Sequence, residues 1–290
     1  MRRIFRLLTA LVIFPAAKSF AQADSLLPNT AFPVKGTFKG TYIQNTASVE
    51  APAEGVLQLV IMHRFGRISD GLYDLFGLDN ATIRLGLDYG ITKNLSVGIG
   101  RSSYEKTLDA SFKYRILTQY SDNSRPLTMS LYAGLAYVTL HYPDKPYYDT
   151  KYRTRYFTQL LLARKFSTAF SLQLTPSWLH YNMVPTTADK NDVFSLGLGG
   201  RAKLSKRISL NAEYTYLFPN QVVSTTVYNS LSAGIDIETG GHVFQLVFSN
   251  SQALVPTSFI SQTTSRWTDG DIYFGFNISR VFQLKKKRSF

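Results

Sequence analysis

The sequence has no cysteine and no run of 18 consecutive apolar residues. Without cysteine there can be no disulfides, thiolate metal sites or lipid anchors attached through a cysteine. Without a long apolar run there is no candidate for a transmembrane helix. Hydrophobic residues make up 44% of the chain. A chain of such moderate hydrophobicity could span a bilayer only as a β-barrel, because barrel strands need apolar residues on one face alone.

Catalytic and metal-binding patterns are also lacking. No HxxxH, HxH or His-x-Ser spacing occurs, so neither a local metal site nor the Ser–His pair of a barrel lipid hydrolase is predicted. The glycines at 98–100 and 197–200 lie inside predicted strands with no helix after them, which excludes nucleotide-binding loops. We therefore predict no catalytic residue, metal, cofactor or enzymatic activity. The open alternative is a lipid-modifying enzyme in which a Ser and a His from different strands meet. The histidines are His63, His141, His180 and His242.

The first 21 residues have the three parts of a signal peptide. Three arginines lie among the first six residues, Leu7 to Ala17 is apolar, and Ser19-Phe20-Ala21 is a small-x-small cleavage signal. We predict export with cleavage of residues 1–21. Residues 22–54 are then expected to be a periplasmic lead-in containing one extended segment at 36–44.

The formal charge of +13 is unevenly distributed. Residues 1–21 contribute four basic residues and no acid, and the tail at 285–290 contributes another four. The remaining basic residues are scattered singly along predicted strands rather than forming a basic helix or an Arg-rich arm. This pattern argues against nucleic acid as a partner.

From residue 55 onward, apolar and polar residues alternate with period 2. In 81–89, for example, every second residue is apolar, while Thr82, Arg84 and Asp88 lie on the opposite face. Segments of about ten residues match tilted membrane-crossing strands, which are longer than typical sandwich strands. Aromatic residues near strand ends suggest interfacial girdles, for instance Tyr89, Phe218, Phe259 and Phe282.

These features predict an all-β fold, a single transmembrane antiparallel up-and-down β-barrel of about twelve strands over residues 55–284. Connections alternate between short turns and longer loops, as in barrels with short periplasmic turns and long outer loops. An even strand count leaves 36–44 outside the wall, either in the lumen or under the barrel. The loop at 66–80 is unusually apolar and is interpreted as a short helix over the barrel mouth or as a ligand-contacting lid. The expected strands are 55–65, 81–90, 94–102, 107–119, 127–140, 152–165, 169–181, 192–204, 207–218, 226–238, 241–250 and 270–283.

The polar strand face would line the interior if the apolar face meets lipid. Burying so many charges in a dry core would cost on the order of several kcal/mol per unpaired ion, whereas a wet, ion-paired lumen tolerates them. The predicted lumen-lining residues are Arg84, Asp88, Lys113, Arg115, Arg201, Lys203, Glu213 and Asp236, together with Asp109, Arg153 and Arg155.

Two functions follow from this face. The first is a passive or selective channel for small solutes, with anionic or amphipathic ones favoured by the basic excess. The second is a structural or interaction barrel whose lumen is closed by ion pairs and whose outer loops meet a partner.

Three segments are distinctive and read HRFGRISDGLYDLFGLDNATIRLGLDYGITKNLSVGIGRSS at 63–103, TGGHVFQLVFSNS at 239–251 and GDIYFGFNISRVF at 270–282. They resemble an uncharacterised family of outer-membrane β-barrel proteins from Bacteroidota-type bacteria. The resemblance covers the whole mature chain. It implies the barrel fold, the outer membrane, and outer-membrane lipid and the barrel assembly machinery as partners. It brings no established activity or functional residue. In barrels of this kind an aromatic residue closes the last strand, and Phe282 has that place here, followed by a basic tail.

Overall fold

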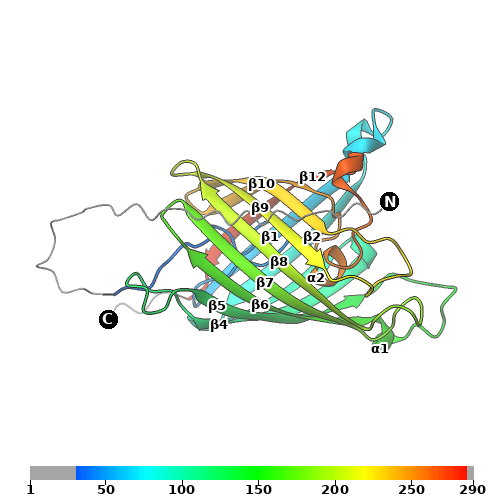
Figure 1. The fold of residues 1–290 in the computed structure, drawn as a ribbon, viewed down its shortest axis with the longest axis horizontal. Coiled ribbons are helices and arrows are strands. Elements are labelled where there is room, and N and C mark those ends of the chain that lie inside the picture. The colour runs from blue at the N-terminus through cyan, green and yellow to red at the C-terminus, as the bar shows by residue number, and fades with distance from the viewer. Residues whose placement is uncertain (1–30, 286–290) are drawn as a thin grey trace, which may run out of the picture. The chain divides into compact units, whose positions relative to one another are not determined.

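Twelve antiparallel strands form one closed barrel in the computed structural model, which describes residues 31–285 (Figure 1). Consecutive strands pair with each other, and β1 pairs with β12 to close the ring. The predicted all-β antiparallel barrel is confirmed, with strand limits within four residues of those expected. The predicted signal peptide and residues 286–290 of the tail lie outside the described residues. The strands are β1 (Val56–Arg67), β2 (Ala81–Gly90), β3 (Leu95–Ser102), β4 (Thr107–Leu117), β5 (Thr128–Val138), β6 (Thr154–Lys165), β7 (Phe170–Tyr181), β8 (Asp192–Lys203), β9 (Ile208–Leu217), β10 (Ser230–Thr239), β11 (His242–Ser249) and β12 (Tyr273–Gln283).

The strand alternation places polar residues inside and apolar residues outside. In β2, Ile83, Leu85 and Leu87 are exposed on the outer surface, whereas Thr82 and Arg84 are buried inside. A water-soluble barrel would show the opposite pattern. The outer surface is thus suited to contact with hydrocarbon.

Short turns join the strands at one end of the barrel, here called the short-turn end. In three of them a hydroxyl accepts backbone N–H groups two and three residues further on, at distances of 3.0–3.2 Å. This local bond stabilises a tight reversal of the chain. The hydroxyls belong to Thr92, Ser167 and Ser205.

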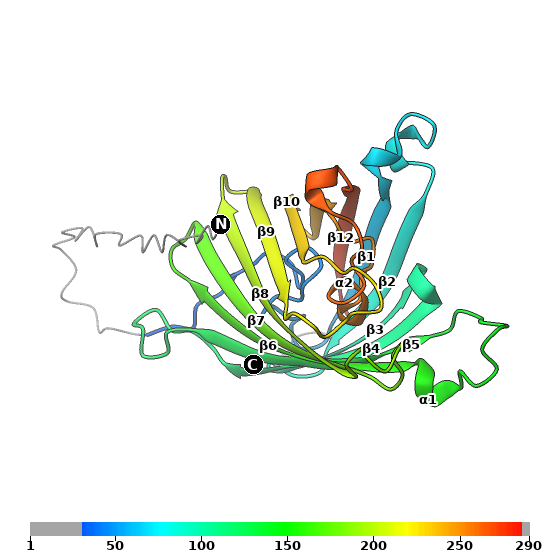
Figure 2. The same cartoon turned by 45° about the vertical axis from the view of Figure 1, so that its right-hand side comes forward.

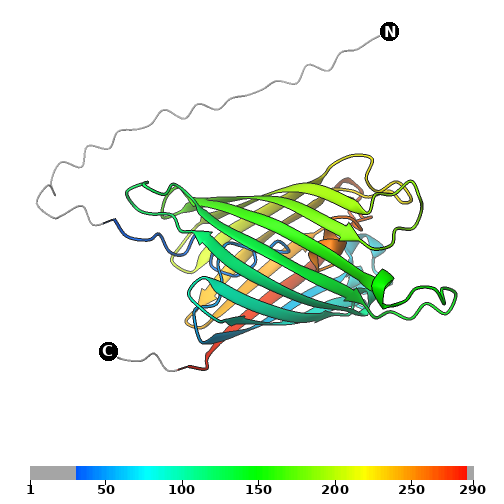
Figure 3. The same ribbon diagram turned by 90° about the horizontal axis from the view of Figure 1, so that it is seen from below.

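The described chain enters and leaves at the short-turn end (Figure 3). Pro33 bridges to Tyr120 of the β4–β5 turn, and Leu284 donates to the carbonyl of Gly55. The segment just before β1 also passes very close to the end of β2. A Cβ on Gly90 would lie 2.1 Å from the carbonyl oxygen of Ala53, so only glycine fits there.

Longer connections join the strands at the other end, here called the long-loop end. They contain short helical turns, and none of the helices in the described part of the chain is long and apolar enough to cross a membrane. The helical elements are η1 (Ile68–Asp70), η2 (Leu75–Gly77), η3 (Tyr104–Lys106), α1 (Thr150–Arg153), α2 (Pro256–Phe259) and η4 (Trp267–Asp269).

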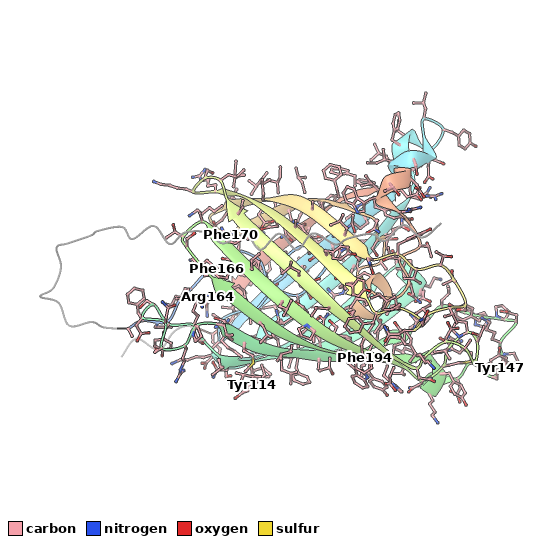
Figure 4. All side chains as sticks on the ribbon, viewed as in Figure 1. Tyr114, Tyr147, Arg164, Phe166, Phe170 and Phe194 are labelled. Carbon is pink, nitrogen blue, oxygen red and sulfur yellow. The ribbon has the colours of Figure 1, made fainter. Side chains whose placement is uncertain are left out.

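Aromatic side chains lie on the outer surface towards both ends of the barrel (Figure 4). At the short-turn end Phe166 packs against Phe170, and the guanidinium of Arg164 lies 5.3 Å from the centre of the Phe166 ring. Phe194 lies towards the long-loop end. The expectation that Phe259 belongs to such a girdle is wrong, because this residue is only 1% exposed and lies in α2.

Candidate functional site

The lumen is occupied by the chain itself. Residues 36–50, here called the inner hairpin, precede β1 and are buried almost throughout (Figure 2). Ile43 N donates to Thr46 O at 2.8 Å and Ser48 N to Thr41 O at 2.9 Å, which closes a tight reversal with Gln44 and Asn45 at its tip. The segment expected at 36–44 therefore lies in the lumen and is not a wall strand.

The tip of the inner hairpin is bound by one carboxylate. Glu213 of β9 accepts the backbone N–H groups of Asn45 at 2.8 Å, Thr46 at 3.1 Å and Gln44 at 3.3 Å. Successive N–H groups that converge in this way form an anion-binding concavity. Glu213 thus replaces the water that these buried donors would otherwise need.

A lysine binds backbone carbonyl oxygens of the same hairpin, whereas Glu213 binds its N–H groups. Lys113 of β4 donates its Nζ to the carbonyl oxygens of Glu50 at 2.7 Å, Ser48 at 2.8 Å and Thr41 at 3.3 Å. Arg115, two residues further along the same face, donates to Val49 O at 3.2 Å. Both cations therefore bind backbone carbonyl oxygens of the hairpin and do not line an open channel.

Four further inner-face residues strengthen the attachment, and sequence reasoning missed all of them. Gln173 accepts from Val49 N at 2.9 Å and donates to Ala47 O at 2.8 Å. The others donate to Ile43 O, Gln44 O and Asn45 Oδ1 at 2.7–2.8 Å. Three of the four are uncharged, so only their place on the polar strand face could have pointed to them. The donors are Gln245 of β11, Asn277 of β12 and Arg64 of β1, respectively.

All eight predicted lumen-lining residues lie on the inner face of the wall. Besides the three that hold the hairpin, Arg84 forms a buried ion pair with Asp109 of β4. Arg201 donates to Ser209 at 3.2 Å, and Asp236 accepts from Gln245 at 2.8 Å. The remaining two are Asp88, which lines a small space beside Lys113, and Lys203, which is half-buried near the short-turn end.

Two further inner-face arginines were expected in the same strand. Arg155 lies on the inner face of β6 and pairs with Glu105. The expectation for Arg153 is wrong, because this residue ends α1 and donates to loop carbonyls at Tyr148 and Leu140.

A second segment enters the lumen from the long-loop end. Residues 250–265 of the β11–β12 connection are here called the inner loop and include α2. They are buried except for the half-buried Gln252 and Gln262 and the exposed Thr264. The Tyr181 hydroxyl hydrogen-bonds with Thr257 O and Ser261 Oγ, which joins the loop to β7. The sequence predicted an outer loop here, but the apolar residues Leu254, Phe259 and Ile260 draw it inward.

The inner hairpin, the inner loop and the wall share one apolar cluster. Phe38 and Ile43 of the hairpin, Phe259 of the loop, and Phe157 and Leu161 of the wall are among its buried members. Burial of each such side chain stabilises the folded state by about 1.5–3 kcal/mol. The lumen therefore has a packed core as well as polar contacts.

The apolar loop at 66–80 does not cover the mouth. It forms the turns η1 and η2 and extends beyond the strands (Figure 2). Leu72 is 75% exposed and Tyr73 is 94% exposed. The expectation of a helix folded over the barrel mouth is therefore wrong.

Residues 31–285 hold no group of three His, Asp or Glu residues close enough to bind a metal ion. His180 Nδ1 lies 2.8 Å from Asp192 Oδ1, which also accepts from Trp178, on the outer surface of β7 and β8. This pair is a contact on the outer surface near the long-loop end.

A cavity of about 270 Å³, here called the mouth cavity, opens at the long-loop end. Four connections and the ends of β6, β7 and β8 form its walls, and Ser261 and Gln262 of the inner loop lie beneath it. It shares no lining residue with the small space beside Lys113. The lining residues are Glu105, Tyr142, Lys145, Tyr148, Arg155, Tyr181, Met183, Val184, Pro185, Asp189, Lys190, Val193, Val222, Ser224, Thr225, Ser261 and Gln262.

A family model described as "Membrane bound beta barrel domain (DUF5777)" matches residues 38–282. No curated protein matches the sequence. Among solved structures, the NanC porin in a rhombohedral crystal form is similar with 8% identity, covering 79% of this chain and 100% of that chain, at a TM-score of 0.48. LpxR from Salmonella typhimurium is similar with 11% identity, 78% and 99% coverage, and a TM-score of 0.39. A mutant porin of Rh. blastica is similar with 12% identity and a TM-score of 0.33, covering 69% of this chain and 55% of that porin, so the chain spans about half its length.

Proposed function

The chain belongs to the DUF5777 family of membrane-bound β-barrel domains, and from this premise we propose that it is an outer-membrane binding protein whose lumen is closed by its own chain. The predicted export signal and the apolar outer surface of the wall support this membrane. With the short turns in the periplasm, the mouth cavity faces the outside of the cell. The protein then acts through its loops and mouth cavity, without enzymatic chemistry.

One observation carries this proposal. The inner hairpin and the inner loop fill the lumen from opposite ends and share one apolar cluster with the wall. A water-filled pore needs a continuous polar path, and a shared apolar core interrupts such a path. Binding at the surface is therefore better supported than steady conduction.

Single-channel recording tests this function. The mature protein is purified in detergent, shown by circular dichroism to be folded β-sheet, and inserted into a planar bilayer. We expect no steady openings under an ion gradient. Steady openings from folded wild-type protein would overturn the closed-lumen proposal.

The selective channel is kept as a second candidate because of how the hairpin is held. Its attachments to Glu213, Lys113 and Gln173 are polar, so withdrawal of the hairpin would leave a wall that water can solvate. Under this candidate the double variant Lys113→Met/Glu213→Gln opens, whereas wild type stays closed. Lys203→Met is the matched control, because it removes an inner-face lysine without a hydrogen bond to the hairpin in the described structure. A folded double variant that stays silent removes the channel candidate.

A further inference from the structure

The mouth cavity has an aromatic and aliphatic side. Tyr142 and Tyr148 of the β5–β6 loop pack edge to face with ring centres 5.4 Å apart. Tyr181, Val193 and Val222 extend this surface from β7, β8 and the β9–β10 loop. Apolar and aromatic walls of this kind bind the body of a small ligand. The cavity volume of about 270 Å³ limits that body to about one or two rings.

The two acidic residues of the cavity are already engaged by the protein. Glu105 accepts both terminal nitrogens of Arg155, at 2.5 and 3.0 Å. Asp189 accepts the backbone N–H of Val223 at 2.7 Å and of Ser224 at 3.0 Å. Burial raises the pKa of Asp189, but these hydrogen bonds outweigh it and hold the pKa below its ordinary value. Both carboxylates are therefore structural.

The two lysines of the cavity lack such partners. Within the described chain, neither Lys145 nor Lys190 forms an ion pair with a carboxylate. The ammonium of Lys145 lies 5.1 Å from the centre of the Tyr142 ring, so it sits at the aromatic side of the cavity. The lining carries a net positive charge from Lys145, Arg155 and Lys190 against Glu105 and Asp189. Both lysines are exposed to solvent, so an anion in the cavity can pair with them without breaking an ion pair within the protein.

The floor of the cavity offers one acceptor. The side-chain oxygen of Gln262 is buried and has no hydrogen-bond partner in the described structure. A buried acceptor without a partner is unfavourable, and a ligand donor that reaches this oxygen would satisfy it. The complementary ligand therefore carries a hydroxyl or amide donor.

We propose that the mouth cavity binds an amphipathic organic anion, with a carboxylate at Lys145 and Lys190, an apolar or aromatic body against the tyrosines, and a donor at Gln262. This inference rests on the proposed function, since it names the ligand class of the same site. A ligand without an apolar part, or one without a charge, would leave one side of the cavity without a complementary group.

Calorimetric titration in nanodiscs tests this inference with 4-hydroxyphenylacetate as the probe. Its alcohol analogue, tyrosol, has the same ring and hydroxyl without the charge. We expect the acid to bind the full mature chain at least tenfold more tightly than tyrosol. The double variant Lys145→Met/Lys190→Met is expected to lose this preference, and Lys151→Met, at a lysine outside the cavity lining, to keep it.

Equal affinity for acid and alcohol, no binding of either, or an unchanged preference in the double variant would overturn the inference. Conductance decides the proposed function separately. A closed barrel that shows no charge preference refutes only the ligand class. A conducting wild-type barrel that binds the acid refutes only the closed lumen.

Discussion

Gly199 of β8 and Ile43 of the inner hairpin share one space in the lumen. A Cβ on Gly199 would lie 2.5 Å from Ile43 Cδ1, closer than any ordinary contact between carbon atoms. The Ile43 side chain therefore fills the space that a side chain at position 199 of the wall would need. This relationship links residues 156 positions apart in the sequence and makes the seating of the hairpin testable.

Gly199→Val should loosen the inner hairpin. The added side chain occupies the place of Ile43, so we expect amide hydrogen exchange of residues 37–49 to become at least tenfold faster while the strands stay protected. Gly197→Val is the matched control, because a Cβ there would contact Thr175 and Thr215 of the wall. Equal exchange of the hairpin in both variants would refute its seating against Gly199.

The pair Ile43→Cys and Gly199→Cys should lock the hairpin to the wall. A Cβ at position 199 lies 3.7 Å from both γ-carbons of Ile43, and the wild-type chain has no other cysteine to compete. We expect spontaneous crosslinking under oxidising conditions, read as a mass loss of two hydrogens and one linked peptide pair. In the Lys113→Met/Glu213→Gln background, any conductance should vanish on oxidation and return on reduction. Failure to crosslink in folded protein would contradict the hairpin position.

The ion pair of Arg84 and Asp109 should show strong coupling. Both side chains are buried, so Arg84→Met leaves an unpaired carboxylate and is expected to destabilise the barrel by about 3–5 kcal/mol. Adding Asp109→Leu removes that charge and should restore much of the loss. Urea unfolding in detergent measures the four members of this double-mutant cycle. Additive effects of the two changes would mean that the pair does not interact.

Asp189 should hold the β9–β10 loop to the β7–β8 loop down to low pH. Its pKa in the folded state is below the ordinary value, so its stabilising effect is present above about pH 4 and is lost only as the pH falls through that lowered pKa. At pH 4 we expect pepsin to cleave residues 218–228 slowly in wild type and at least tenfold faster in Asp189→Ala. Asp144→Ala, in the neighbouring loop, is the control. Rapid cleavage of wild type at pH 4 would contradict a lowered pKa.

The wall was largely predictable from the sequence, because one physical rule governs it. Apolar residues that face lipid alternate with polar residues that face inward, so the strands and the inward position of residues such as Arg84 and Glu213 follow from period 2 alone. The role of those residues did not follow. Glu213 and Lys113 bind backbone atoms of the hairpin, and backbone atoms carry no sequence signal.

The contents of the lumen were only partly predictable. The even strand count placed residues 36–44 outside the wall. The residue pattern of this segment did not distinguish the lumen from the space under the barrel. The alternation of short and long connections predicts an outer loop at 251–269, because that connection belongs to the long set. Its apolar residues could not be placed without knowing that the barrel had room for them. The loop at 66–80 shows the reverse error, since its apolar residues remain exposed.

The place of the inner hairpin in chain order has a consequence for how the protein is made. Residues 36–50 precede every strand in the sequence, whereas the seam between Val56 of β1 and Gln283 of β12 can form only when both ends of the barrel sequence are present. Pairing across so large a sequence separation is slow. The hairpin also binds strands from both sides of that seam, through Arg64 and Asn277. It can therefore serve as an internal template that gathers the first and last strands before the seam closes.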